Sequence, residues 1–313
     1  MPSEGSGEEP CCWLPRADKR GYYGAYAQAG APFGVILANV AFMIISYTVS
    51  EDAFMQWGWR IPFLSSVVLI GISMYVQLNM EDTDAFKELQ QLQKLKLAEA
   101  PQATVIKRSP VVEAIRKYPK RIALAAGAFL SIQVTFYILI GFVLAYGTDP
   151  SGAALTRNEM LFAVLLASAL QVPSQFIAAA YSDRHGRRGI FMLGAILTGV
   201  WAFALFPLID TGNFWLIVVG ISGGLMFLGM MYGPQAAFFT ELFSTEVRYS
   251  GASLGYQMGA ILGGAFAPTI ATILWTEYDI FWVSVYIAIA SLLSLISVVM
   301  LTETYKTNLH DTD

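Results

Sequence analysis

A short charged segment near the middle of the chain has the residue types and spacing of an ion-pair cluster. Ser182 to Arg188 reads SDRHGRR, with one carboxylate and three arginines around a single glycine. Gly186 permits a sharp turn between two helices, because glycine has no Cβ. We expect Arg187 and Arg188 to anchor in the lipid headgroup region, and Asp183 to pair with them or to face the N-terminus of a neighbouring helix. An ordinary positively charged loop with a turn glycine has the same pattern, so both interpretations stay open.

A second set of side chains is uncharged and polar and lies inside long apolar segments. Lipid offers such groups no hydrogen-bond partner, so they line a cavity or bond between helices. Gln171 and Gln175 are four residues apart and therefore share one face of a helix. Amides and phenols can orient a carboxylate or a zwitterion, but an interhelical hydrogen bond of about 0.6–2 kcal/mol explains each of them equally well. The substrate-cavity candidates are Gln133, Thr135, Tyr137, Gln171, Ser174, Gln175, Tyr232, Gln235, Tyr256 and Gln257.

The remaining reactive side chains predict neither an enzyme nor a metal site. Cys11 and Cys12 are adjacent, so they provide neither a disulfide framework nor spaced zinc ligands. His185 and His310 are too isolated for metal binding or a catalytic triad. The net charge of −4 argues against a nucleic-acid partner. We therefore expect no catalytic residue, no cofactor and no metal.

The elements that must position these residues are membrane-spanning helices. Hydrophobic residues make up 56% of the 313 residues and charged residues 13%, against about a quarter charged in a soluble domain. A spanning helix needs about 20 mainly apolar residues. Eight segments fit that length: 22–49, 61–80, 122–146, 160–181, 190–209, 214–240, 250–275 and 280–301. The predicted fold class is an all-α polytopic membrane protein in the lipid bilayer.

Glycines and prolines inside these segments predict how the helices pack. Pro173, Pro234 and Pro268 each lack a backbone donor, so we expect them to bend their helices. Small-residue stripes favour close helix packing. The glycines of these stripes are Gly255, Gly259, Gly263 and Gly264 in the seventh segment and Gly220, Gly223, Gly224, Gly229 and Gly233 in the sixth.

The lysines and arginines predict the orientation, because short loops rich in them stay in the cytoplasm. Only Arg60 and Arg157 of the 19 fall on the opposite side. The other 17 lie in residues 16–20, 87–121 and 184–188 and at Arg248 and Lys306. With eight crossings, both termini are expected on the cytoplasmic side of the cell membrane.

One long polar stretch, 81–120, separates two predicted helices from the six that follow. Apolar residues recur at near-helical spacing from Phe86 to Leu97, which is typical of an amphipathic helix on the membrane surface. A solvated linker is an equal alternative. The expected domains are a cytoplasmic tail that does not look native (1–20), the last two helices of an N-terminal bundle (21–80), the cytoplasmic linker (81–120), a six-helix C-terminal bundle (121–302) and a cytoplasmic tail (303–313).

The helix starts at 19–30 and 247–259 resemble each other. Each has a basic residue at the membrane edge, closely spaced small residues, a Tyr and Gln pair and then a glycine. The first helix therefore corresponds to the seventh, and internal repeats of this kind are typical of secondary transporters. If the repeat unit is six helices, the first helix is the fifth of its own unit. We then expect that four helices are missing in front of it.

Several segments resemble the major facilitator superfamily of transporters. The segment after the fourth helix resembles its cytoplasmic loop signature Gly-x-x-x-Asp-Arg-x-Gly-Arg-Arg, with Ala179 in place of the first glycine. Residues 58–64, 81–86, 241–243 and 248–257 resemble one branch, the metabolite:H+ symporters, which carry proline or betaine, shikimate, α-ketoglutarate, citrate and similar solutes. The resemblance implies a twelve-helix major facilitator fold in two bundles, of which this chain supplies helices five to twelve.

The resemblance also implies an inner gate at the cytoplasmic ends of the helices. Glu241 and Arg248 bracket a second cytoplasmic loop, and together with the arginines of the first loop they would close the gate when the cavity faces outward. Separate surface pairs worth under about 1 kcal/mol each are an equal alternative. The gate and loop residues are Asp183, Arg184, Gly186, Arg187, Arg188, Glu241 and Arg248.

The function that follows is proton symport of a small organic acid or zwitterionic metabolite by alternating access. Proton coupling requires an ionisable group inside the membrane, and the eight segments hold none. The coupling group is therefore expected in the missing helices, and this chain alone is expected to be inactive. Residues 1–15 have no apolar run where the fourth helix should end, which favours a truncated, frame-shifted or split gene. The alternatives are a non-transporting membrane fragment and one subunit of a split transporter.

Overall fold

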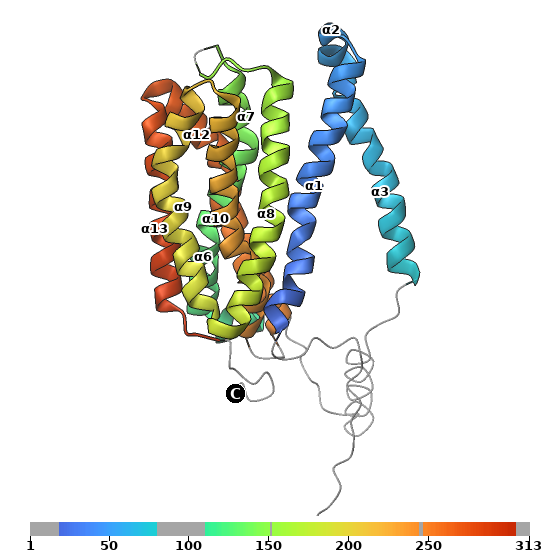
Figure 1. Cartoon of the computed structure of the whole chain (residues 1–313). Coiled ribbons are helices and arrows are strands. Elements are labelled where there is room, and N and C mark those ends of the chain that lie inside the picture. The colour runs from blue at the N-terminus through green and yellow to red at the C-terminus, as the bar shows by residue number, and fades with distance from the viewer. Residues whose placement is uncertain (1–18, 80–109, 151, 244–246, 305–313) are drawn as a thin grey trace, which may run out of the picture. The chain divides into compact units, whose positions relative to one another are not determined.

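The computed structural model describes residues 19–79, 110–150, 152–243 and 247–304, and every regular element in these ranges is a helix. Eight helices among them are long and apolar enough to cross a membrane (Figure 1). Their bounds are Arg20–Thr48, Phe54–Asn79, Pro119–Thr148, Arg157–His185, Arg187–Asp210, Phe214–Glu241, Arg248–Glu277 and Ile280–Met300. The predicted all-α membrane fold is confirmed, and each helix overlaps one of the eight predicted segments.

Five of these spans are single helices, and three are built from several elements. The single helices are α1 (Arg20–Thr48), α8 (Arg157–His185), α9 (Arg187–Asp210), α10 (Phe214–Glu241) and α13 (Ile280–Met300). The others consist of α-helices joined to π-helical segments: η2 (Phe54–Gly58) with α3 (Arg60–Asn79); α6 (Pro119–Tyr137), η3 (Ile138–Phe142) and α7 (Val143–Thr148); and α11 (Arg248–Ala260), η4 (Ile261–Ala265) and α12 (Ala267–Glu277). Two short helices, α2 (Glu51–Ala53) and α5 (Pro110–Lys117), precede η2 and α6.

The prolines affect these helices in different ways. Pro268 stands in the first turn of α12, directly after η4, so the break expected in the seventh span is present there. A proline has no N–H for the preceding turn, but it fits the start of a new helix. By contrast, α8 and α10 run through Pro173 and Pro234 as unbroken helices.

The chain divides into two compact units, one formed by Met1–Val40 with Pro110–Asp313 and the other by Ala41–Ser109. The division falls inside α1. In the smaller unit, the rings of Phe42 and Phe63 meet edge to face with their centroids 6.0 Å apart. The sequence-based domains instead keep the first two helices together, and that division stays a prediction.

Four of the sequence-based assignments fall largely or wholly on residues outside the described ranges. These are the N-terminal tail (1–20), the cytoplasmic linker (81–120), the amphipathic helix within it (86–97) and the C-terminal tail (303–313).

Glycines allow the helices of the larger unit to pack backbone against backbone. α10 packs against both α8 and α9, and α6 packs against α11 and α13. A Cβ added to Gly233 of α10 would lie 2.2 Å from the carbonyl oxygen of Gln175 on α8. A Cβ added to Gly259 of α11 would lie 2.8 Å from the carbonyl oxygen of Ala126 on α6. The close packing predicted for the two glycine stripes is therefore confirmed.

We expect Gly233→Ala to lower the free energy of unfolding by about 1–3 kcal/mol, because the new methyl group meets backbone rather than a flexible side chain. Thermal unfolding of the purified chain in detergent measures the change. Gly189→Ala on α9 is the control, since nothing lies within 4 Å of a Cβ added there. Equal stability of the two variants would show that α8 and α10 can move apart near Gly233 at little cost.

Two hydrophobic clusters fill the larger unit, one containing Phe142 and Phe206 and the other containing Phe129 and Phe243. α6, α9, α10 and α13 pass from one cluster to the other near their middles, and α8 contributes to the first cluster only, as far as Ala167. Buried polar residues lie at or just beyond these points. We call these residues the polar layer: Ser131 and Thr135 on α6, Ser168 and Gln171 on α8, Thr198 on α9, and Ser291 and Ser294 on α13. Only part of the layer is bonded internally, for example through the hydroxyls of Ser131 and Ser291 at 2.9 Å.

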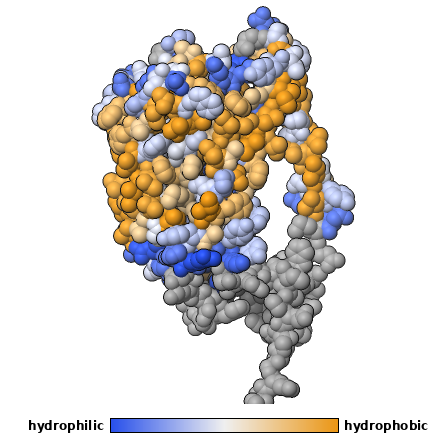
Figure 2. Space-filling view, viewed as in Figure 1, coloured by the Kyte–Doolittle hydropathy of each residue, from blue (hydrophilic) through white to orange (hydrophobic). Residues whose placement is uncertain are grey.

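The outer surface of the larger unit is apolar along most of its helices. Ile177, Val200 and Leu293 are among its large exposed side chains, with 70%, 66% and 47% of their surfaces exposed. Figure 2 shows this face of the bundle as a hydrophobic belt with hydrophilic residues at both ends. Such a belt is the surface expected of a protein in lipid.

Candidate functional site

The charged segment of the sequence forms a tight helix–helix junction. α8 continues through Asp183 and Arg184 to His185, and α9 begins at Arg187, so the loop expected from the sequence is reduced to Gly186. The φ angle of Gly186 is +102°, which favours glycine. The predicted glycine turn is therefore confirmed, but its charged neighbours belong to the last turn of α8 and the first turn of α9.

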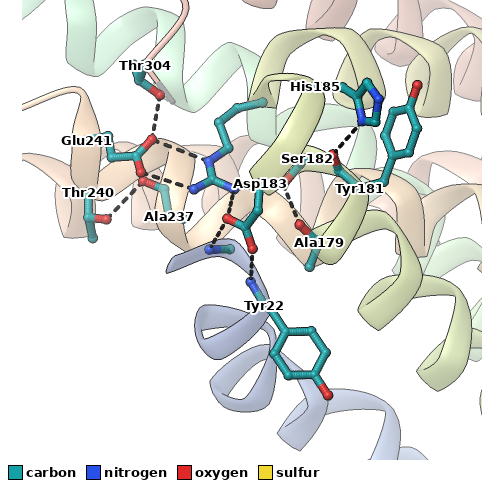
Figure 3. Close-up of polar contacts among 12 residues, drawn as sticks. Tyr22, Ala179, Tyr181, Ser182, Asp183, His185, Ala237, Thr240, Glu241 and Thr304 are labelled. Atoms are coloured by element: carbon teal, nitrogen blue, oxygen red, sulfur yellow. Dashed lines mark hydrogen bonds and ion pairs between the residues drawn. The ribbon is translucent and has the colours of Figure 1, made fainter. Parts of the chain in front are cut away.

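Arg187 is buried, so its expected role as a headgroup anchor is wrong. Only 1% of its surface is exposed. Its Nη1 donates to Asp183 Oδ1 at 2.6 Å and to the hydroxyl of Ser182 at 2.8 Å. Its Nε and Nη2 donate to the two carboxylate oxygens of Glu241 at 3.4 and 3.3 Å (Figure 3). The guanidinium fork bridges two carboxylates from α8 and α10, and this pairing explains how it can be buried.

Asp183 also holds the N-terminus of α1. Its two carboxylate oxygens accept the backbone N–H groups of Gly21 and Tyr22, each at 2.8 Å. The first amides of a helix have no partner within the helix, and the helix dipole favours an anion there. Both kinds of partner expected for Asp183 are therefore present, an arginine and a helix N-terminus.

Two residues that the sequence analysis missed complete this cluster. The hydroxyl of Thr304 donates to Glu241 Oε2 at 2.7 Å. The carboxylate of Glu303 accepts the N–H groups of Arg187 and Arg188, at 2.9 and 3.1 Å, and so caps α9 as Asp183 caps α1. The available signal was an acidic residue just after the last apolar segment, where it can meet the start of another helix.

The other charged candidates lie at the edge of this cluster. Arg188 donates to the carbonyl oxygens of Val298 and Val299 at the C-terminus of α13, at 3.1 and 2.7 Å. Arg248 donates to the carbonyl oxygen of Phe243 at 3.4 Å. Arg184 is exposed. We define the inner cluster as Ser182, Asp183, Arg187, Glu241, Glu303 and Thr304.

Next to the inner cluster, a cavity of about 400 Å³ opens between α1, α10 and α11. Three substrate-cavity candidates, Gln235, Tyr256 and Gln257, line it. Gln28 of α1 donates from Nε2 to Oε1 of Gln235 at 3.2 Å across this cavity wall. The complete lining is Gln28, Gln235, Ala236, Phe239, Thr240, Tyr249, Ala252, Ser253, Tyr256 and Gln257. These walls offer amides, hydroxyls and aromatic rings without a charged side chain.

Two candidates on α8 are buried deeper in the bundle. Gln175 donates from Nε2 to the carbonyl oxygen of Ala25 on α1 at 3.2 Å. Gln171 is 1% exposed, and neither of its amide atoms has a hydrogen-bond partner among the described residues. The hydroxyls of Thr135 and Ser168 in the polar layer are likewise unpaired within the described ranges. A buried unpaired amide costs free energy, so Gln171 is a candidate for a hydrogen bond to a solute.

The remaining candidates have different surroundings. Gln133 and Tyr137 lie against Gly264 at the break in the seventh span. Tyr232 is 8% exposed and joins a hydrophobic cluster. Ser174 faces a separate apolar groove between α8 and α9 and donates to the carbonyl oxygen of Met226 at 2.8 Å. The ten candidates therefore do not form one site, and their roles in substrate binding stay predictions.

The arrangement of these helices and polar groups is that of a membrane transporter bundle. Residues 122–312 match the Major Facilitator Superfamily, and the chain belongs to this family. The xylose–proton symporter XylE, in complex with 6-bromo-6-deoxy-D-glucose, has a similar fold, with a TM-score of 0.68 and 16% sequence identity. The similarity covers 95% of this chain and 67% of that one. At this identity the similarity shows the fold alone.

The curated relatives are metabolite transporters. The chain is 35% identical over 294 residues to the inner membrane metabolite transport protein YhjE of Escherichia coli K12, covering 91% of this chain and 63% of that protein. It is 31% identical to the shikimate transporter and 26% identical to the proline/betaine transporter of the same organism. These matches cover 64% and 56% of the two relatives. The chain thus spans less than two thirds of the length of these relatives.

Proposed function

We propose that this chain forms the part of a proton-coupled symporter that binds a small organic acid or zwitterion during alternating access. The observation that carries the proposal is the uncharged polar cavity between α1, α10 and α11. Amides and hydroxyls can orient the carboxylate of a solute, while an aromatic ring can cover its apolar part. The shikimate and proline/betaine transporters among the relatives support this substrate class.

The inner cluster supports the proposed inner gate. α1 is held by Asp183 at its first amides, by Gln175 at Ala25 and by Gln235 at Gln28. If α1 moves with the other bundle, these three contacts break when the two bundles rock apart, and they form again when the cytoplasmic side closes. We place both termini and the inner cluster on the cytoplasmic side, as the lysine and arginine distribution indicates.

We further propose that this chain alone does not transport. The Asp, Glu, Lys, Arg and His residues of the described spans lie near helix ends, and the polar layer at mid-depth contains none of them. Proton coupling needs an ionisable group that can reach the solute pathway. We therefore assign the coupling group to a part of the protein outside this chain, encoded either in the same reading frame or separately.

Solute uptake by cells that lack their own uptake systems for these solutes tests this proposal. The 313-residue chain and a version extended upstream would be compared for accumulation of labelled proline, betaine, shikimate and α-ketoglutarate, with and without a protonophore. We expect protonophore-sensitive uptake from the extended version alone. Uptake by the 313-residue chain itself would contradict the assignment of the coupling group. Uptake by the extended version that the protonophore does not reduce would contradict proton symport.

A further inference from the structure

A second hollow in the bundle has no part in the proposed transport pathway. It lies between α8 and α9 over α10, has a volume of about 700 Å³, and shares no lining residue with the cavity at α1, α10 and α11. The small residues Ala178 and Gly189 leave this space, and no heavy atom lies within 4 Å of a Cβ added to Gly189. We call it the α8–α9 groove.

The walls of the groove are apolar except at one end. Leu170, Ile177, Leu193, Met226 and Met230 line most of its length. Methionine side chains are flexible and adapt to irregular apolar ligands. Ile177 is 70% exposed, so the groove opens on the apolar outer surface of the bundle.

The polar end of the groove lies beside the helix junction at Gly186. There the rings of Tyr181 and His185 stack with their centroids 4.1 Å apart, and the side chain of Tyr181 is exposed. Arg184 is exposed in the same turn of α8. Asp183 is paired with Arg187 and with the first amides of α1, and the carboxylate of Glu303 is occupied by the N–H groups of Arg187 and Arg188. A phosphate at this end would meet the ring donors of Tyr181 and His185 and the guanidinium of Arg184.

The length of the groove matches one leaflet of a bilayer. It runs along α8 from Leu170, in the middle of the span, to His185 at its end. At a rise of 1.5 Å per residue this is about 22 Å. One leaflet, including its headgroup layer, is about 20–22 Å thick. The groove is thus about as long as a lipid molecule from its headgroup to the end of its acyl chain.

We propose that the α8–α9 groove binds one acyl chain of a phospholipid whose phosphate contacts Tyr181 and His185. The apolar wall takes the chain, and the ring donors with Arg184 take the phosphate. The groove touches both the junction at Gly186 and the helix α10 that carries Glu241. A lipid bound there would stiffen the elements that hold the inner cluster.

Photolabelling of the full chain in nanodiscs tests the proposal. The probe is a phosphatidylglycerol that carries a diazirine near the end of one acyl chain, and labelled peptides are mapped by mass spectrometry. We expect labels concentrated on the groove residues of α8, α9 and α10. Gly189→Leu fills the groove and is expected to reduce this labelling about tenfold. Ile177→Trp enlarges an exposed wall residue without disturbing the core, and as a second test it should reduce the same labelling.

The controls separate specific binding from general contact with lipid. Gly141→Leu adds the same side chain at another exposed glycine with nothing within 4 Å, and it should leave the groove labelling unchanged. His185→Gln with Tyr181→Phe should weaken labelling by phosphatidylglycerol but not by a diacylglycerol with the same chain. Equal labelling around the whole bundle, insensitivity to Gly189→Leu, or cross-links between two copies of the chain would overturn the proposal.

Discussion

Replacing Arg187 with methionine is expected to lower the free energy of unfolding by about 3–5 kcal/mol, because removal of one partner leaves uncompensated buried charge. Asp183 would still accept two amide N–H groups from α1. Glu241 would keep the hydroxyl of Thr304 and the coulombic attraction of Arg248, and its side chain is 2% exposed. Most of the loss should therefore come from the stranded carboxylate of Glu241.

Denaturant unfolding of the purified chain in mixed micelles measures this loss. Arg184→Met is the matched control, because Arg184 is an exposed arginine in the last turn of α8, and its effect should stay within about 0.5 kcal/mol. Adding Glu241→Gln to Arg187→Met removes the stranded charge and should recover much of the stability. If the two arginine variants behaved alike, or if the double variant recovered nothing, the inner cluster would not be a buried charge network.

The membrane spans and the pairing of Asp183 with an arginine could be predicted from the sequence, whereas only the family resemblance groups Glu241 with these arginines, and nothing in the sequence predicts that Arg187 is buried. The spans follow from local composition, since an apolar run of sufficient length must cross the bilayer as a helix. The burial of Arg187 depends on Glu241, which is 54 residues away, and no local pattern shows that the start of α9 meets the end of α10. The positive charges near a membrane edge therefore suggested a headgroup anchor.

Gly186 and Asp183 were easier to anticipate, because their roles depend on neighbouring residues. A glycine between two long apolar helices permits a turn, and an acid beside it can cap a helix that begins nearby. That the helix is α1 is a tertiary fact, given by the hydrogen bonds from Gly21 and Tyr22. Glu303 shows the limit of this reasoning, because a single acid after the last helix has many possible neighbours.

The polar candidates could be chosen from the sequence, but the sequence could not show which of them face the bundle interior and which face the α8–α9 groove. Gln171 and Ser174 are three residues apart, so their directions on α8 differ by only about 60°. Gln171 nevertheless points into the bundle interior, while Ser174 lines the α8–α9 groove. The difference arises because α10 packs against α8 between Gln171 and Ser174. A Cβ added to Gly229 of α10 would lie 3.3 Å from the carbonyl oxygen of Gln171 and 3.3 Å from the hydroxyl of Ser174. A packing edge of this kind cannot be read from one helix alone.

Gln171→Met is expected to stabilise the chain by about 1–3 kcal/mol, because it replaces a buried amide that has no partner in the described residues with an apolar side chain of similar shape. Gln175→Met is the control, since its amide donates to the carbonyl oxygen of Ala25 and its loss should not stabilise. Unfolding in mixed micelles compares the two. A loss of stability in Gln171→Met would mean that its amide is bonded, for instance to water held in the polar layer.

The same substitution should remove function from the version of the protein that transports. If Gln171 is kept unpaired in order to bind the solute, Gln171→Met should reduce uptake by at least about tenfold, which corresponds to the loss of a hydrogen bond of about 1.4 kcal/mol or more. A gain in stability combined with a loss of uptake is the signature of a residue retained for binding at a cost to folding. Thr135→Val removes another unpaired hydroxyl of the polar layer and tests whether the solute reaches that helix. A stabilised Gln171→Met variant with full uptake would exclude Gln171 from the solute site and leave the cavity at Gln235, Tyr256 and Gln257 as the remaining candidate.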